Sequence, residues 1–191
     1  MDAGLRRAVL IVALLNLAYF GVEFAVARRI GSVSLFADSI DFLEDASLNL
    51  LILVALGWSA RNRARVGMAL AAILLVPGLA TLWTAWAKFA QPLAPDASAL
   101  SLTGAGALVV NLSCAFLLAS YRHHSGSLTK AAFLSARNDA FANLGIIGAG
   151  LLTIALRSAW PDLIVGLAIA AMNADAAREV FGAARRETAE R

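Results

Sequence analysis

The chain has 191 residues, of which 60% are hydrophobic, with a mean hydropathy of +0.75 and a formal net charge of +3. Soluble domains average roughly 45–50% apolar residues, and the excess here lies in long blocks, so the composition excludes an ordinary soluble domain. Basic residues stand at the ends of these blocks rather than in one patch, which argues against nucleic acid as a partner. The single cysteine, Cys114, excludes an intrachain disulfide and a cysteine-rich metal site.

The apolar blocks predict six transmembrane helices, because a helix needs about 20 mainly apolar residues to cross a membrane. We therefore expect an all-α fold, a polytopic six-helix bundle over residues 1–182, followed by a short charged cytoplasmic tail at 183–191. The predicted helices cover, in chain order, residues 9–27, 34–58, 66–89, 98–121, 128–156 and 162–181.

The distribution of Lys and Arg predicts the orientation of the bundle. One set of helix ends carries eleven basic residues: Arg6, Arg7, Arg61, Arg63, Arg65, Arg122, Lys130, Arg178, Arg185, Arg186 and Arg191. The opposite set carries four: Arg28, Arg29, Lys88 and Arg157. Since positive loops stay on the cytoplasmic side, we expect a cell-membrane protein with both termini in the cytoplasm.

Four acids within eight residues interrupt the second apolar block: Asp38, Asp41, Glu44 and Asp45. A charge at the bilayer centre costs at least about 2.5–3.5 kcal/mol. At 100° per residue, three of these acids share one helix face with Asn49, and Glu44 lies to one side. A plainer interpretation is a re-entrant or interfacial helix, or pairing with Arg137. Four acids against one base leave a negative site, which favours cations.

The fifth predicted helix carries a second polar stripe of Ser135, Asp139 and Asn143, with Asn138 partly on the same side. At about 1.5 Å per residue, Asp139 lies roughly 14 Å from the cytoplasmic end of its helix. Asp41 and Asp45 lie roughly 14–20 Å from the opposite surface by the same arithmetic. In a hydrocarbon core about 30 Å thick, the two groups meet near the midplane.

These side chains predict a metal site made of oxygen ligands. Its expected members are Asp41, Asp45 and Asp139, with Ser135 or Asn138 as a fourth ligand. Oxygen ligands suit magnesium, calcium and manganese, whereas zinc usually takes nitrogen or sulfur as well. Crowded, desolvated carboxylates also bind protons, so metal and protons would compete for the same oxygens.

Several further polar residues are candidates for supporting or proton-coupling roles: Asp38, Glu44, Glu23 and Asn143. Glu23 lies in the first predicted helix, either as a proton-relay group or as the ion-pair partner of Arg137. His123 and His124 stand in a cytoplasmic loop and either gather metal or are ordinary polar loop residues. Asp162, near a helix end, is expected to be an ordinary cap or interface residue.

At these residues the sequence resembles the cation diffusion facilitator family of divalent-metal/proton antiporters. The segment GSVSLFADSIDFLEDASLNL at 31–50 is similar to the family's second-helix signature, and LSARNDAFANLGII at 134–147 is similar to its fifth helix. The resemblance covers nearly the whole chain. It implies six helices with cytoplasmic termini, Asp41 and Asp45 as one ligand pair, and Asp139 as a ligand opposite them.

Two departures from the family pattern matter. The family usually has His or Asp where this chain has Ser135. If Asn138 substitutes as the ligand, the resemblance implies a tetrahedral site that is weaker and less zinc-like. The chain also stops after the sixth helix, so we expect a short form without the family's cytoplasmic domain. A homodimer, if one forms, must then be held together by membrane helices.

The resulting functional prediction is a transporter that exports a divalent transition metal from the cytoplasm in exchange for protons. No prosthetic group is expected; zinc, cobalt, cadmium, manganese or iron would be the substrate, and lipid the surroundings. Two alternatives stay open: a relative that binds metal without transporting it, and an intramembrane metal-dependent enzyme. The enzyme alternative is disfavoured, because the acids lie on two distant helices and no Asp-Gly pair occurs.

Overall fold

The computed structural model describes residues 3–55, 79–119 and 127–173, together with Trp58, Asn62 and Tyr121. Within α5 the side chains are described from Ala136 onward. Several predicted features therefore lie outside the described residues: the start of the third helix at 66–78, His123 and His124, the side chain of Ser135, and the tail at 183–191.

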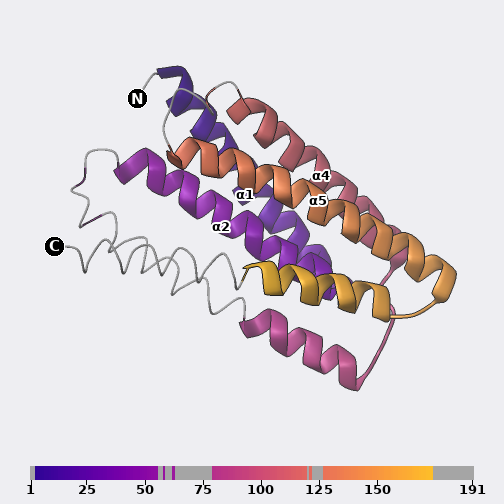
Figure 1. Cartoon of the computed structure of the whole chain (residues 1–191). Coiled ribbons are helices and arrows are strands. Elements are labelled where there is room, and N and C mark those ends of the chain that lie inside the picture. The colour runs from indigo at the N-terminus through magenta and orange to yellow at the C-terminus, as the bar shows by residue number, and fades with distance from the viewer. Residues whose placement is uncertain are drawn as a thin grey trace.

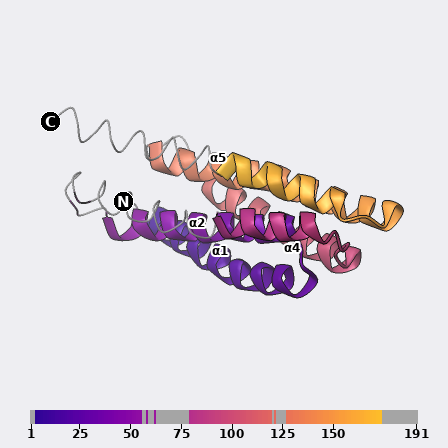
Figure 2. The same cartoon turned by 90° about the horizontal axis from the view of Figure 1, so that it is seen from below.

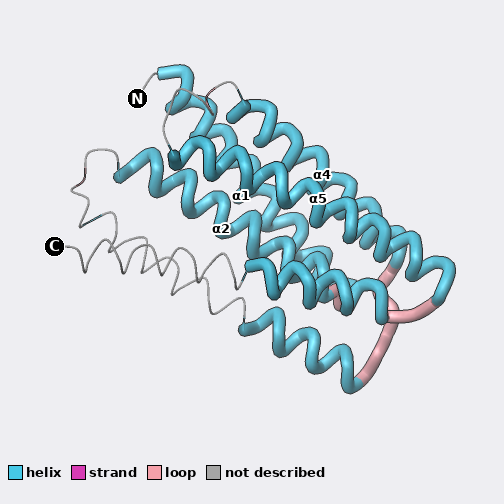
Figure 3. The backbone as a smooth tube through the Cα atoms, in the orientation of Figure 1, coloured by secondary structure: helices cyan, strands magenta, loops and turns pink. Residues whose placement is uncertain are grey.

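All regular secondary structure in the described residues is helical (Figure 3). Four long helices are α1 (Ala3–Ile30), α2 (Val33–Ala55), α4 (Ala97–Ala119) and α5 (Ser127–Leu156). Two shorter helical segments are residues 79–90, called here the third helix, and Trp160–Asn173, called here the sixth helix. The all-α prediction is confirmed.

Among the described residues, three helical stretches are long and apolar enough to cross a membrane: Ala3–Ile30, Ala97–Ala119 and Ala136–Leu156. The sixth helix is apolar but shorter in its described part. α2 has 23 residues, about 34 Å of helix, which is long enough to cross a membrane. Its four acids, however, make it too polar to count as an apolar span. The structure thus supports a multi-pass membrane protein. It does not fully confirm six spans, because α2 is too polar and the described part of the sixth helix is too short.

The helices run side by side in one bundle (Figure 1), and the view from below shows the same alignment (Figure 2). α1 packs against α2 and α4, α4 packs along α5, and α2 faces α5. Glycine permits the close approach of α4 and α5: a Cβ added at Gly104 would lie 2.8 Å from the Ile146 side chain. This packing brings the acid-bearing face of α2 toward α5.

The turn between α1 and α2 follows from its sequence. Gly31 has a φ of +65°, which glycine adopts readily, and the Ser32 amide donates to the Ala27 carbonyl at 3.1 Å, as in a Schellman cap. Ser32 then caps the next helix, because its Oγ accepts a hydrogen bond from the Leu35 amide at 3.1 Å. The second helix therefore starts at a fixed position, which sets the depth of its acids.

The outer surface of the bundle is apolar, and its largely apolar interior also holds several buried polar side chains. Large side chains such as Phe116 (81% exposed), Leu102 (74%) and Phe141 (67%) point outward, as expected for a surface in contact with lipid. Asn16, Glu23, Asp38 and Asn143 are fully buried among the helices instead. Because intramembrane polar groups face the interior when they have a function or a partner, this interior is the place to look for the site.

Candidate metal site

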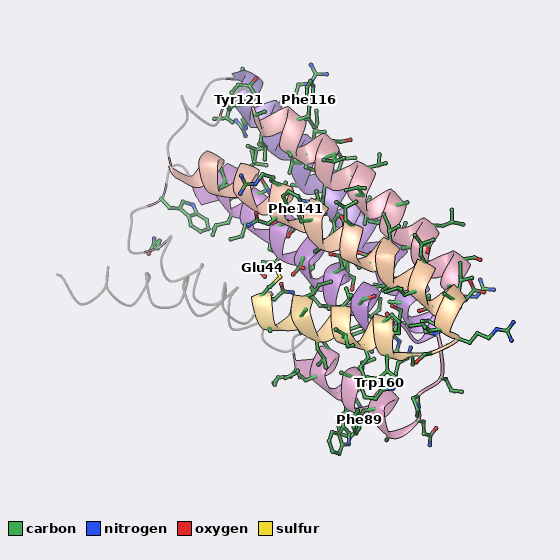
Figure 4. All side chains as sticks on the ribbon, turned by 45° about the vertical axis from the view of Figure 1, so that its right-hand side comes forward. Glu44, Phe89, Phe116, Tyr121, Phe141 and Trp160 are labelled. Carbon is green, nitrogen blue, oxygen red and sulfur yellow. The ribbon has the colours of Figure 1, made fainter. Side chains whose placement is uncertain are left out.

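A cavity of about 170 Å³ lies between α2, α5 and the end of the sixth helix. Acids and amides make up most of its wall: the lining residues are Asp41, Glu44, Asp45, Leu48, Asn138, Asp139, Met172 and Asn173. Figure 4 shows Glu44 beside the last described turn of the sixth helix. The cavity thus gathers carboxylates from two helices that are nearly a hundred residues apart in the chain.

Helical spacing explains why these side chains converge. Asp41, Asp45 and Leu48 follow one another at intervals of four and three residues, which places them on one face of α2. Asn138 and Asp139 belong to the α5 segment that faces α2. The carboxyls of Asp45 and Asp139 are near enough to interact as hydrogen-bonding neighbours across the cavity. The structure therefore brings together four of the five predicted metal-site residues.

The cavity acids differ in exposure. Asp45 is 7% exposed, whereas Asp41, Glu44 and Asp139 are half-buried. The negative charges of Asp41, Asp45 and Asp139 act on one another. Within the part of the chain that the structure describes, no three His, Cys, Asp or Glu side chains form a ready-made metal cage. The cavity is an acid-lined space with room for several water molecules rather than a closed coordination shell.

A second polar group lies deeper in the bundle, beside the cavity. The Asn143 Nδ2 atom donates to Asp38 Oδ2 at 2.6 Å, and the Asn111 Nδ2 atom donates to Asn143 Oδ1 at 3.0 Å. All three side chains are buried and come from α2, α5 and α4. This chain fixes the orientation of the Asn143 amide, since each of its polar ends has a different partner.

Glu23 of α1 completes this deeper group and has the least satisfied surroundings. It is fully buried, and neither of its carboxyl oxygens accepts a hydrogen bond within the described residues; Asp38 Oδ1 also lacks a donor. The Glu23 and Asp38 carboxyls lie close enough for their charges to interact. Two carboxylates repel each other, so this contact is attractive only when one of them carries a proton.

Arg137 does not neutralise the acids. Its side chain is exposed, and its Nη2 atom donates to Asn138 Oδ1 at 3.4 Å. No ion pair between Arg137 and an acid occurs among the described residues, so of the two roles left open for Glu23 the structure does not show the pairing with Arg137. The physical reason is direction: Arg137 projects from the outer face of α5, while Glu23 faces the interior from α1.

Two hydrogen bonds between buried polar side chains were not predicted from the sequence. Asn111 supports Asn143 from α4, and the Cys114 thiol donates to Asn16 Oδ1 at 3.6 Å between α4 and α1. Each of these polar side chains interrupts an otherwise apolar span, the same signal that identified Glu23. Cys114 also packs in an apolar cluster with Val9, Val12 and Leu118.

The arrangement can attract cations into a space lined by oxygen ligands, and it can hold protons on the same or neighbouring carboxyls. Oxygen donors and proton-binding carboxyls in the interior of a membrane bundle are features of ion pathways.

Comparison with known families gives one match, and no individual curated protein matches the chain. The family model described as "Cation efflux transmembrane domain" matches residues 9–187, which is almost the whole length of the chain. The match agrees with the resemblance seen at 31–50 and 134–147. The chain therefore belongs to the cation efflux family, also called the cation diffusion facilitators, whose members are membrane transporters of divalent metal cations rather than enzymes.

Proposed function

We propose that this protein exports a divalent transition metal from the cytoplasm in exchange for protons. The observation that carries the proposal is the cavity in which Asp41 and Asp45 of α2 stand opposite Asn138 and Asp139 of α5. Such a set of oxygens on two helices suits a hydrated cation that must enter, lose water and leave again.

The proposed ligands are Asp41, Asp45 and Asp139, with Ser135 or Asn138 as the fourth. Because no closed metal cage exists among the described residues, binding would require the side chains to draw together across the cavity. A metal ion would relieve the repulsion among the three carboxylates, which supplies the driving force for that closure. An oxygen-rich set favours manganese or iron(II) relative to a site that contains histidine.

Protons would use the same oxygens when the metal leaves. Metal ligands must be deprotonated, so metal affinity falls as the pH is lowered. We assign Glu23, Asp38 and Asn143 a supporting role in this exchange: the Glu23–Asp38 contact needs a proton, and Asn143 holds Asp38 in place. Glu44, at the cavity wall, would attract the cation on entry.

The direction of transport rests on the loop charges. Eleven basic residues lie on the side of the bundle that carries the N- and C-termini. This excess of positive charge favours a cytoplasmic location of that side in the cell membrane. The cavity wall reaches Leu48, Met172 and Asn173, which lie toward the same ends of α2 and the sixth helix. The cavity would then receive metal from the cytoplasm.

The test is metal uptake into proteoliposomes under an imposed pH gradient, with zinc, cobalt, manganese and iron(II) compared. The Asp45→Asn and Asp139→Asn variants should lose uptake, and Asp96→Asn, a change of similar chemistry at an exposed loop, should keep it. Uptake should depend on the pH gradient and stop when an ionophore collapses it.

The remaining alternative, a relative that binds metal without moving it, makes a different prediction. Such a protein would bind metal with loss of affinity in Asp45→Asn, yet no uptake of any metal would follow in correctly inserted protein. Binding measured by equilibrium dialysis beside the uptake assay separates the two functions.

A further inference from the structure

Asp162, near the start of the sixth helix, is fully buried and accepts five hydrogen bonds. Its Oδ1 atom accepts from the hydroxyls of Ser32 at 2.6 Å and Ser34 at 2.7 Å and from the Ser34 amide at 3.1 Å. Its Oδ2 atom accepts from the Val33 amide at 2.9 Å and pairs with Lys88 Nζ at 3.2 Å. One carboxylate thus binds the first turn of α2 and a charged side chain of the third helix.

Lys88 completes the connection, because its Nζ atom also donates to the carbonyl of Gly31 in the α1–α2 turn. Outside this buried contact, the rings of Phe89 and Trp160 meet edge to face, with centroids 5.8 Å apart (Figure 4). The third helix, the sixth helix and the α1–α2 turn are therefore joined at one end of the bundle. We call the set of Ser32, Ser34, Lys88 and Asp162 the Asp162 cluster.

The backbones at this cluster are in close contact. A Cβ added at Gly166 would lie 2.7 Å from the backbone of Val33 and from the amide nitrogen of Ser34. The Val33 side chain is fully buried between Ala85 of the third helix and Leu163 of the sixth. The α1–α2 turn, the third helix and the sixth helix are therefore packed directly against one another at the cluster.

The Asp162 cluster and the cavity lie at different levels of the same helices. Asp41 follows Val33 by eight residues and Asn173 follows Asp162 by eleven, which places the cavity about 12–17 Å along the axes from the cluster. The sixth helix therefore contributes to both: its first turn holds the cluster, and its last described turn lines the cavity.

A simple cap would not need this construction. At the same end of the bundle, Asp96 caps α4 by one local hydrogen bond to the Ala99 amide at 2.7 Å, in an exposed position. Ser32 already caps α2 in the same local way. Asp162 adds contacts across about 130 residues of sequence and brings a buried ion pair, which costs desolvation energy and contributes chiefly specificity of arrangement.

We propose that the Asp162 cluster is a latch that closes the translocation path at the α1–α2 end, so that the metal site opens to the opposite side. This inference rests on the proposed transport function. Opening the path toward the α1–α2 end requires the third and sixth helices to separate from the first turn of α2, and the Val33 side chain becomes accessible when they do.

The experiment uses Val33 as a reporter of that separation. Cys114 is the single cysteine, so a Cys114→Ala background with Val33→Cys has one thiol, placed between the three joined elements. Sealed proteoliposomes are treated with a membrane-impermeant maleimide on the side of the α1–α2 turn, and the initial labelling rate is measured. Asp162→Asn and Lys88→Met are added separately, with Asp96→Asn as the matched control; Lys88→Met leaves the serine and amide donors of Asp162 in place.

We expect slow labelling of the reporter alone and a labelling rate at least about tenfold higher in both latch variants, since each loses a charge-assisted hydrogen bond. Asp96→Asn should label like the parent. A zinc or manganese gradient that drives transport should also raise labelling of the parent protein. Equal labelling in the parent and both latch variants would overturn the latch, as would an equal rise in Asp96→Asn.

The same vesicles separate the latch from the transport proposal. If the parent takes up no metal but the latch variants label faster, the transport proposal fails, whereas the inference that the Asp162 cluster holds the α1–α2 end closed is retained. If the parent transports metal and its labelling rate is unaffected by metal or by the latch changes, the latch inference fails and transport stands.

Discussion

Asp162 and Glu23 are both fully buried acids in this bundle, yet their surroundings are opposite. Asp162 accepts five hydrogen bonds and pairs with Lys88, whereas Glu23 accepts none among the described residues. Burial alone therefore does not mark a functional acid. The difference lies in the partners: a satisfied carboxylate fixes the structure, and an unsatisfied one awaits a proton or a cation.

The cavity acids have surroundings unlike those of Asp162, because several other acids line the same space. Asp41, Asp45 and Asp139 face one another with their negative charges interacting, and Arg137 points away from them. Asp38 is intermediate, because one of its oxygens is bonded to Asn143 and the other has no donor. The bundle thus has one carboxylate held in place by hydrogen bonds at one end and several mutually repelling carboxylates in its middle.

The largest expected effect is on transport. Asp139→Ala should reduce metal uptake by more than about 100-fold, because even partners outside the ligand shell are worth about 10–100-fold in affinity or activity. The folded protein should survive, since the change removes like-charge repulsion. Uptake assays and size-exclusion chromatography of the same preparation check both parts; normal uptake would exclude Asp139 as a ligand.

Asp162→Ala should instead affect stability first. Removing one partner of a buried charge pair costs about 3–5 kcal/mol, and Lys88 would keep only the Gly31 carbonyl as a partner. We expect the free energy of unfolding in mixed detergent micelles to fall by about that amount. A change below about 1 kcal/mol would mean that the cluster contributes little to stability.

The same carboxylate-to-amide change should have opposite signs at the two acids. Glu23→Gln should raise the free energy of unfolding by about 1–2 kcal/mol, because an amide group can donate to Asp38 Oδ1 and an unsatisfied buried polar group costs about that much. Asp162→Asn should lower it. Unfolding curves for the two variants test the comparison directly, and a shared sign would refute the distinction between them.

The smallest effect is expected in the Asn111–Asn143–Asp38 chain. Asn143→Ala should lower the free energy of unfolding by about 1–2 kcal/mol, since side-chain hydrogen bonds within membranes average about 0.6 kcal/mol each and reach about 1.7. Asn111→Ala should cost about half as much, because it removes one of the two bonds and leaves Asp38 held. Equal losses in both variants would show that Asp38 gains nothing from Asn143.

Much of the site could be predicted from the sequence because charges in apolar spans are rare and costly. The second-helix acids, Asp139, Asn143 and Glu23 were identified in this way, and helical spacing placed Asp41 and Asp45 on one face. The sequence left open whether Glu23 pairs with Arg137, because the direction in which Arg137 projects depends on how α5 is rotated in the bundle. Asn111 was overlooked, although its polar side chain lies in an apolar span.

The sequence by itself determined the membrane class and the helical fold, because apolar length and the 3.6-residue period are local properties of the chain. Its motifs at 31–50 and 134–147 also indicated the family. Only the tertiary structure decided which acids have partners. Asp162 looks like the cap of its own helix in the sequence, but it caps α2 and binds Lys88. Partners 74 to 130 residues away meet only when helices pack, and this packing separates a structural carboxylate from those left to bind a cation.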